Sequence, residues 1–177
     1  ILKRHELSAE KRAEFLATME AQVEKLDFLM QSLIKMSRLE AGTFALHMET
    51  GSLHETIAQA VSGVWTKATQ KNISIDVQCD SQMTVNHDVK WTAEALFNLL
   101  DNAVKYTPEG GNIHVSVRPW QFFTRIDISD TGMGIAAGHY HDVFKRFYRA
   151  QEAANTEGVG LGLYLARGII TRQKGYI

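Results

Sequence analysis

Two asparagines in one predicted helix form a candidate metal-binding pattern in this sequence. Asn98 and Asn102 lie four residues apart in a largely apolar segment, so they share one helix face. Asparagine is a poor helix former, and its amide oxygen is a neutral ligand suited to Mg²⁺, which takes few protein ligands. Lys105, one turn further on, could meet a phosphate group. A polar stripe facing solvent is the alternative interpretation of this spacing.

Two groups of glycines follow along the chain. Asp130 ends a predicted strand and precedes Gly132 and Gly134, where a bare backbone lets a flat ring approach while the carboxylate accepts from an amino group. The spacing also matches a dinucleotide-binding fingerprint, but the regular helix that this motif requires does not follow. Alternate glycines in residues 157–162 open a predicted helix, where backbone N–H groups and the helix dipole favour an anion. A flexible hinge is the alternative for this second group.

An aromatic and basic segment, residues 143–149, lies between the two glycine groups. Phe144 and Phe147 would anchor it, and Arg146 and Arg149 could bind phosphate oxygens in a bidentate manner. An amphipathic turn with solvated arginines is the alternative interpretation.

The elements that must position these groups follow from hydrophobic periodicity. Residues 8–40 contain no Gly or Pro and carry apolar residues at coiled-coil spacing, which predicts one helix of about 50 Å. Such a helix cannot bury its apolar face alone; Ser8 and Gly42 are its expected ends. Further helices are predicted at 52–70, with Trp65 facing inward, at 88–106 and at 158–172, and strands at 43–48, 73–77, 83–86, 112–118 and 122–129. Strand pairs between helices indicate an α+β sandwich with antiparallel pairing.

The composition is that of a globular chain of 177 residues, with 45% hydrophobic and 22% charged residues. A formal net charge of -1 argues against a nucleic-acid or membrane-surface partner. The single Cys79 excludes an internal disulfide, and no apolar run approaches the roughly 20 residues of a membrane span. Because the chain starts at Ile1 and ends at Ile177 just after a turn, we expect it to be a piece of a longer protein.

In this order, the motifs resemble those of the catalytic and ATP-binding domain of sensor histidine kinases, within the ATPase group that includes gyrase, Hsp90 and MutL. Residues 94–106 are similar to the N box of that domain, 130–134 to the G1 box, 144–149 to the F box and 158–162 to the G2 box. The resemblance implies an α+β fold, a two-layer α/β sandwich of the Bergerat ATP-binding type preceded by a long bundle-type α-helix. It also implies ATP and Mg²⁺ as cofactors and a role in two-component signal transduction.

The resemblance further implies a role for each matching residue. The Mg²⁺ ligands would be Asn102 and Asn98, the phosphate contacts Lys105, Arg146, Arg149 and the backbone of Gly158, Gly160, Leu161 and Gly162, and the adenine contacts Tyr106, Asp130, Gly132 and Gly134. Residues 135–157 would form a lid over the nucleotide. Hydrolysing relatives carry a glutamate that activates water where this chain has Asn98, which suits transfer of the phosphoryl group to a side chain.

Residues 1–42 are similar to the second helix of a dimerisation and phosphotransfer hairpin, and residues 43–177 to a catalytic domain without its last strands. The family's acceptor histidine stands in a His-Glu-Leu-Arg-Thr-Pro context on the first hairpin helix, whereas His5 lacks the Arg-Thr-Pro. The acceptor is therefore expected outside this chain, so the fragment should not phosphorylate itself. We expect the cytoplasmic portion of a bacterial membrane-bound sensor, dimerised through hairpin helices and serving a response regulator receiver domain.

Two alternatives come from different classes of protein. One is a hydrolytic enzyme or a serine kinase of the same ATPase group, against which the hairpin-like helix at residues 8–42 argues. The other is a signalling scaffold with an idle nucleotide pocket. The intact set of candidate residues argues against it: Asn98, Asn102, Asp130, Gly158, Gly160 and Gly162.

Overall fold

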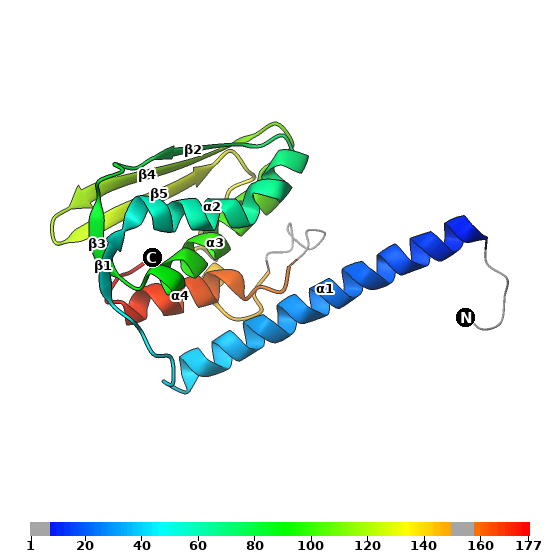
Figure 1. Ribbon diagram of the computed structural model, residues 1–177, viewed down its shortest axis with the longest axis horizontal. Helices are drawn as coiled ribbons and strands as arrows, with labels where there is room; N and C mark the ends of the chain where they lie inside the picture. Colours follow the sequence, from blue (N-terminus) through cyan, green and yellow to red (C-terminus); the bar gives the residue numbers. More distant parts are fainter. Residues whose placement is uncertain (1–7, 150–157) are drawn as a thin grey trace.

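A sheet and a group of helices form the two layers of the main body in the computed structural model, which describes residues 8–149 and 158–177 (Figure 1). In chain order the elements are α1 (Ala9–Glu40), β1 (Glu49–Ser52), α2 (Leu53–Gln70), β2 (Ser74–Gln78), β3 (Thr84–His87), α3 (Val89–Tyr106), β4 (Asn112–Trp120), β5 (Phe123–Asp130), the short 3₁₀ helices η1 (Ala137–His139) and η2 (Asp142–Phe144), and α4 (Gly162–Arg172). Strands β2, β4 and β5 form one sheet, and β1 and β3 form a separate ribbon. Helices α2 and α3 lie against the sheet, and α4 packs beside α3.

Three helix starts agree with the sequence predictions because a side chain caps each of them. Ser8, Ser52 and Asp88 each accept a hydrogen bond from the backbone N–H three residues later. Gly42 follows the end of α1 with a φ of 69°, the left-handed conformation that favours glycine after a helix. The long first helix is therefore confirmed at both ends.

Strand pairing is mixed, which corrects the expectation of antiparallel pairs alone. In the hairpin, β4 and β5 are antiparallel, with Trp120 opposite Phe123. Strand β2 instead runs parallel to β4, with Ser74 opposite Asn112. A parallel pair needs a crossover connection, and the segment that holds β3 and α3 provides it.

The strand expected at residues 43–48 is wrong, because this segment packs as an extended linker. Phe44 is buried against Trp91, with ring centroids 4.0 Å apart. The backbone N–H of His47 donates to the carboxylate of Asp88 at 2.7 Å, so a side chain rather than a neighbouring strand satisfies it. The first strand is β1, which pairs with β3.

Apolar side chains gather in two clusters. The first lies between the sheet and helices α2 and α3 and contains Leu53, Ile57, Ala60, Val64, Leu96, Leu100, Val104, Ile113 and Val115. The second joins α1, the linker, α3 and α4 through Leu39, Phe44, Ala95, Ala166 and Ile169. Trp65 is 57% exposed, against the prediction, because its neighbour Val64 takes the buried position and successive helical residues point about 100° apart.

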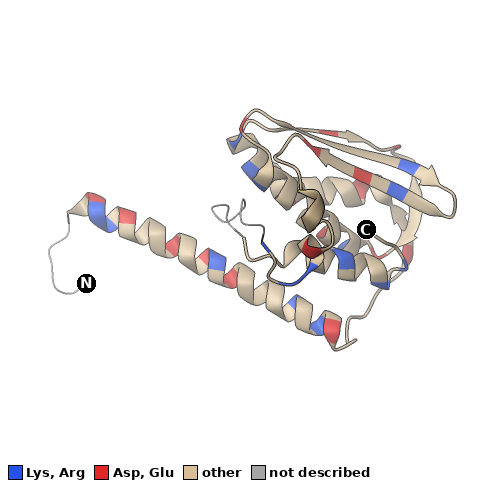
Figure 2. Cartoon of the chain, turned by 180° about the vertical axis from the view of Figure 1, so that it is seen from behind, with Lys and Arg blue, Asp and Glu red and all other residues tan. Residues whose placement is uncertain are grey.

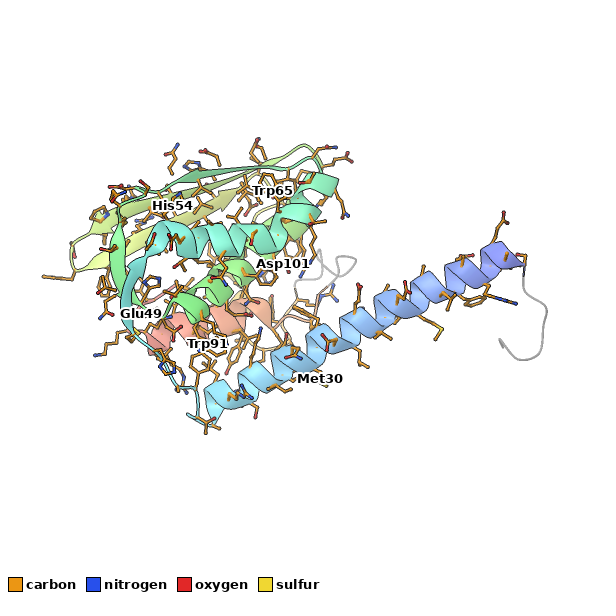
Figure 3. The ribbon with its side chains drawn as sticks, in the orientation of Figure 1. Met30, Glu49, His54, Trp65, Trp91 and Asp101 are labelled. Atoms are coloured by element: carbon orange, nitrogen blue, oxygen red, sulfur yellow. The ribbon has the colours of Figure 1, made fainter. Side chains whose placement is uncertain are left out.

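Helix α1 projects from the main body, and its N-terminal half lies away from it in both views (Figure 1, Figure 2). Charged residues of both signs are spread along it (Figure 2). Its large apolar residues stay exposed: Phe15, Leu16, Met19, Val23, Leu26, Leu33 and Met30, the last labelled in Figure 3. This exposure is what a helix with an unpartnered apolar face would show. No helix in the described part of the chain combines the length and the apolar character that crossing a membrane requires.

Candidate functional site

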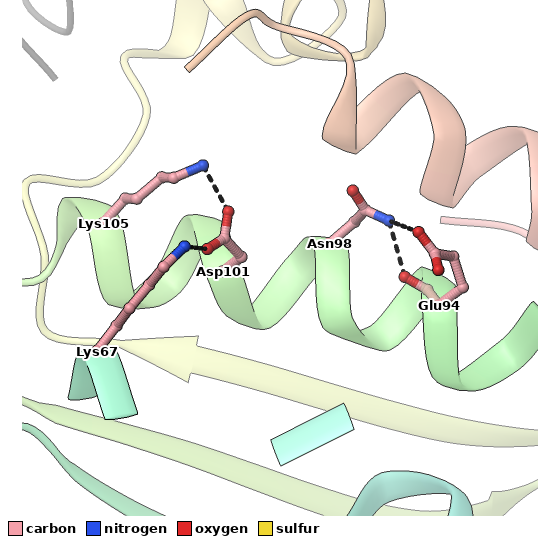
Figure 4. A network of polar contacts seen from close by, with 5 residues as sticks. All are labelled: Lys67, Glu94, Asn98, Asp101 and Lys105. Carbon is pink, nitrogen blue, oxygen red and sulfur yellow. Dashed lines mark hydrogen bonds and ion pairs between the residues drawn. The ribbon is translucent and has the colours of Figure 1, made fainter. Parts of the chain in front are cut away.

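The predicted polar stripe of α3 holds one asparagine in a defined orientation. Asn98 is 6% exposed, and its Nδ2 donates to the backbone oxygen of Glu94 at 2.8 Å and, at 3.4 Å, to the Glu94 carboxylate (Figure 4). Because a carbonyl oxygen can only accept, the nitrogen of the amide must face Glu94. The Asn98 Oδ1 is therefore left to face away from its own helix.

The first residue of α4, Gly162, lies against both asparagines. A Cβ added at Gly162 would stand 3.1 Å from Oδ1 of Asn98 and 3.6 Å from Nδ2 of Asn102. The start of α4 thus meets the polar stripe of α3, and the absence of a side chain lets the two helices approach closely. Within residues 8–149 and 158–177, no hydrogen bond holds the Asn102 side chain, so its amide can rotate.

Lys105 is held by an ion pair at the other end of the stripe. Its Nζ lies 2.5 Å from Oδ2 of Asp101, and Lys67 of α2 binds Oδ1 of the same carboxylate at 2.8 Å (Figure 4). Burial raises the pKa of Asp101, but the hydrogen bonds and charges of the two lysines outweigh burial and hold this pKa below its ordinary value. A Cβ added at Gly158 would lie 4.0 Å from the Lys105 Nζ. Lys105 therefore stands where the second glycine group begins.

The second glycine group is bonded to the aromatic and basic segment. Gly160 has a φ of 74°, and its carbonyl accepts from the N–H of Phe147 at 2.9 Å. A Cβ at Gly160 would lie 2.5 Å from the carbonyl oxygen of Tyr148. Helix α4 starts at Gly162, four residues later than predicted, because positive φ at Gly158 and Gly160 does not fit a right-handed helix.

Arg146 contacts α1 in this structure. Its Nη1 lies 2.6 Å from Oε1 of Glu40, and its guanidinium lies 5.1 Å from the ring centroid of Tyr164. The Tyr164 hydroxyl donates to the same Glu40 oxygen at 3.1 Å. Phe147, expected to anchor this segment, is 55% exposed. The phosphate contacts of Arg146 and of the exposed Arg149 stay predictions.

A pocket of about 440 Å³ lies at the end of α3, lined by Lys71, Lys105, Tyr106, Thr107, Pro108, Thr131, Gly132 and Met133. The loop after β5 approaches α3 closely here, because a Cβ at Gly132 would stand 2.7 Å from the carbonyl oxygen of Tyr106. Asp130 Oδ1 accepts from the N–H of Gly132 at 2.8 Å, which orients the carboxylate. Gly134 has a φ of 70° and open space around it. Tyr106 and Gly132, assigned to the base from the sequence, thus line one pocket.

Three side chains that hold the site were missed by sequence reasoning: Asp101, Lys67 and Lys71. The Lys71 ammonium closes the C-terminal end of α3 by donating, at 2.7, 3.1 and 2.5 Å, to the carbonyl oxygens of Val104, Lys105 and Thr107. Asp101 could have been found, because it stands four residues before Lys105 on the same helix face. Lys67 of α2 and Lys71, directly after α2, left no such local signal.

The expected lid, residues 135–157, is described as far as Arg149, where it contains η1 and η2. Residues 150–157 of the lid lie outside the described residues, including Glu157 at the start of the second glycine group. His5 also lies outside them.

Comparison with known proteins identifies the family. Residues 87–177 match the model of the histidine kinase-, DNA gyrase B-, and HSP90-like ATPase family. The chain belongs to this family. The swarming motility regulation sensor protein RssA of Serratia marcescens is 29% identical over 161 residues, which cover 90% of this chain and 34% of RssA. This histidine kinase-like chain spans between about a fifth and a third of the length of the curated relatives it matches.

Solved structures of histidine kinases share the fold. Full-length ShkA in complex with AMPPNP matches 96% of this chain and 35% of ShkA, with a TM-score of 0.76 and 26% identity. Histidine kinase ThkA in complex with the response regulator protein TrrA matches 98% of this chain and 48% of ThkA, with a TM-score of 0.74 and 20% identity. The α+β sandwich is confirmed, and the chain carries the ATP-binding catalytic domain of sensor histidine kinases.

Proposed function

We propose that this chain binds Mg²⁺–ATP where α3 meets α4 and presents the γ-phosphate to a histidine on a helix outside the chain. The observation that carries the proposal is the contact of Gly162 with Asn98 and Asn102. The Asn98 amide oxygen, the Asn102 amide and the N-terminus of α4 meet there, and together they suit a metal-bound chain of phosphates.

The two asparagines fit a magnesium ion. The bond to Glu94 leaves the Asn98 oxygen facing outward, and the Asn102 amide can rotate to the same side. Mg²⁺ takes few protein ligands and keeps several waters, so two amide oxygens are a sufficient protein contribution. When bound, Mg²⁺ supplies neutralisation of negative charge on the phosphate oxygens.

Cations and backbone N–H groups would bind the phosphates. Lys105 already lies beside Gly158, and the backbone of Gly160, Leu161 and Gly162 offers N–H groups at the start of α4. Arg146 and Arg149 would join them after the lid rearranges.

The pocket at the end of α3 would receive the adenine. Tyr106 and Gly132 line it, and the Asp130 carboxylate at its edge would accept from the exocyclic amino group. Gly134 would let the following loop lie close to the ring.

Catalysis would consist of positioning and charge stabilisation. The acceptor imidazole nitrogen would bond to the γ-phosphorus while the bond to the ADP oxygen breaks, and ADP would leave. The Asn98 amide is not a base, so this position cannot activate water as the glutamate of hydrolysing relatives is expected to do. The pattern favours transfer to a side chain over hydrolysis.

Residues 1–42 would act as one helix of a dimerisation hairpin, and residues 43–177 as the catalytic unit. The exposed apolar row on α1 supports this division, because a helix of this length needs a partner helix to cover such a face. A homodimer of the intact parent would supply that cover. His5 precedes α1, and no second long helix pairs with α1 in the described residues, so the proposed acceptor lies on a helix outside the chain and the fragment alone would not autophosphorylate.

A response regulator receiver domain would accept the phosphoryl group from the intact parent. ThkA, which shares this fold, was solved with a response regulator. We further propose that the parent is a membrane-bound bacterial sensor of which this chain is a cytoplasmic part, as the sensor proteins among its relatives suggest.

Calorimetry with a non-hydrolysable ATP analogue, with and without Mg²⁺, tests the nucleotide site. Binding is expected in the wild-type chain, and Asn102→Ala and Asp130→Ala should each weaken it at least tenfold, the loss expected from one charge-assisted contact. Asp127→Ala is the matched control, because Asp127 lies on β5 and pairs with Arg118 and Arg125 of the hairpin. No binding, or binding unchanged in both variants, would contradict the assignment.

Incubation with ATP carrying a labelled γ-phosphate tests the missing acceptor. The chain alone should take up no acid-labile label, whereas a matching first hairpin helix joined in front of it should be labelled. Stable labelling of His5 in the unmodified chain would show that the acceptor is present after all.

A further inference from the structure

Asp101 lies in the C-terminal half of α3, the helix that carries the proposed nucleotide contacts, and it is nearly covered. Its side chain is 7% exposed, and both of its oxygens are bonded, Oδ1 to Lys67 and Oδ2 to Lys105 (Figure 4). A covered carboxylate is costly unless it is paired, so the charge at this position needs its two lysines.

The ion pair with Asp101 holds the Lys105 ammonium in one position. Lys105 has a flexible four-carbon stem and three N–H donors, and Asp101 engages one of the donors at 2.5 Å. The ammonium also lies 5.9 Å from the ring centroid of Phe28 in α1 and beside Gly158, where an added Cβ would lie 4.0 Å from Nζ. The lysine is therefore ordered before any ligand arrives.

Lys67 completes the arrangement from a different helix. It reaches Oδ1 of Asp101 from α2 at 2.8 Å, so the carboxylate is held from one side and holds Lys105 on the other. The three charges sum to one positive charge, so the trio still attracts an anion. Ordering a side chain in advance reduces the entropy lost when a ligand binds.

We propose that Asp101 is a positioning residue that, supported by Lys67, fixes Lys105 for contact with the nucleotide phosphates. This rests on the proposed function. It predicts that Asp101 strengthens the binding of ATP even though its own charge repels phosphate. A purely structural carboxylate would instead leave ATP binding tighter or unchanged when its charge is removed from a folded chain.

The test is calorimetry of the full chain with the non-hydrolysable ATP analogue and with adenosine. Asp101→Asn should weaken binding of the analogue about three- to tenfold, within the range of one typical hydrogen bond, and leave adenosine binding unchanged. Lys105→Met should weaken the analogue by at least as much. In the Lys105→Met background Asp101→Asn should cause no further loss and at most a small gain, because the group that it positions is gone and only its repulsion of phosphate remains.

Two further variants control for a general effect of charge and for unfolding of the chain. Asp127→Asn removes the charge of a paired aspartate on the hairpin and should change neither ligand's binding. Asp101→Glu keeps the charge but moves it by one methylene, so it should weaken the analogue while circular dichroism shows a folded chain; this variant carries the test if Asp101→Asn does not fold.

The outcomes separate the two proposals. Normal binding of the analogue to Asp101→Asn and Asp101→Glu, or equal loss for Asp101→Asn with and without Lys105, would overturn the positioning role while the nucleotide site stands. Failure of the wild-type chain to bind the analogue would overturn both.

Discussion

The guanidinium of Arg146 lies 2.6 Å from the carboxylate of Glu40, which ties the aromatic and basic segment to the last turn of α1. Tyr164 of α4 supports the pair, since its hydroxyl donates to Glu40 and its ring lies under the guanidinium. Arg146 is also one of the residues proposed to bind phosphate. Because one guanidinium cannot occupy both places, α1 and the nucleotide would compete for it.

Glu40→Gln should therefore raise the affinity for the ATP analogue. An exposed ion pair contributes up to about 1 kcal/mol, so the gain should not exceed about fivefold. Arg146→Met should lower the affinity, and Glu40→Gln should have no effect in that background. Calorimetry on the four chains measures this coupling, and an equal gain without Arg146 would contradict the competition.

Replacing Gly168 of α4 by alanine should have opposite effects on stability in two backgrounds. An added Cβ would overlap the Cδ2 atom of Leu39, so the glycine lets the end of α1 approach α4. Gly168→Ala should destabilise the chain by about 1–3 kcal/mol through overpacking. In a Leu39→Ala background the same change should stabilise by up to about 1 kcal/mol, because alanine is the better helix former. Urea unfolding of the four chains tests this, with the uncrowded Gly138→Ala as control.

Local signals in the sequence predicted most of the fold. Ser8, Ser52 and Asp88 predict the helix starts, because a short polar side chain can accept a hydrogen bond from the free N–H groups there. The β4–β5 hairpin is also predicted from a local signal, because the alternation of apolar and polar residues in each strand depends only on neighbouring residues. The pairing of β2 with β4 was not, because a parallel pair joins strands that are distant in the sequence.

Some residues of the candidate site have a local signal in the sequence, and others do not. Asn98 and Asn102 were visible as a stripe with a period of four, and the structure brings Gly162 to them. Lys67 and Lys71 could not be predicted, because they bind α3 from α2 and from the residue that follows α2. The linker at residues 43–48 was mistaken for a strand because alternation in a short segment also suits an extended chain that packs its side chains on helices.

Gly160 and Gly134 form a matched pair for testing the phosphate cradle. Both have positive φ, 74° and 70°, but a Cβ meets backbone atoms only at Gly160. Gly134→Ala should cost about 1 kcal/mol of unfolding free energy from the backbone conformation alone. Gly160→Ala should cost more, about 2–4 kcal/mol, and should displace Phe147. It should also weaken the ATP analogue more than Gly134→Ala does; equal effects on unfolding would show that the Gly160 contact is unimportant.

The lowered pKa of Asp101 predicts how stability depends on pH. A carboxyl whose pKa is lower in the folded than in the unfolded chain stabilises the fold above its unfolded value, near 3.8 here, and loses this effect as the pH falls through the folded value. In urea unfolding between pH 5 and 7, Asp101→Asn should therefore have a free energy of unfolding about 2 kcal/mol lower than that of the wild-type chain. The difference should shrink steadily as the pH falls below about 4, because the wild-type carboxyl then becomes neutral as well. A gap that stays constant down to pH 3 would mean that the aspartate acts through packing, and that its bonds to Lys67 and Lys105 do not depend on charge.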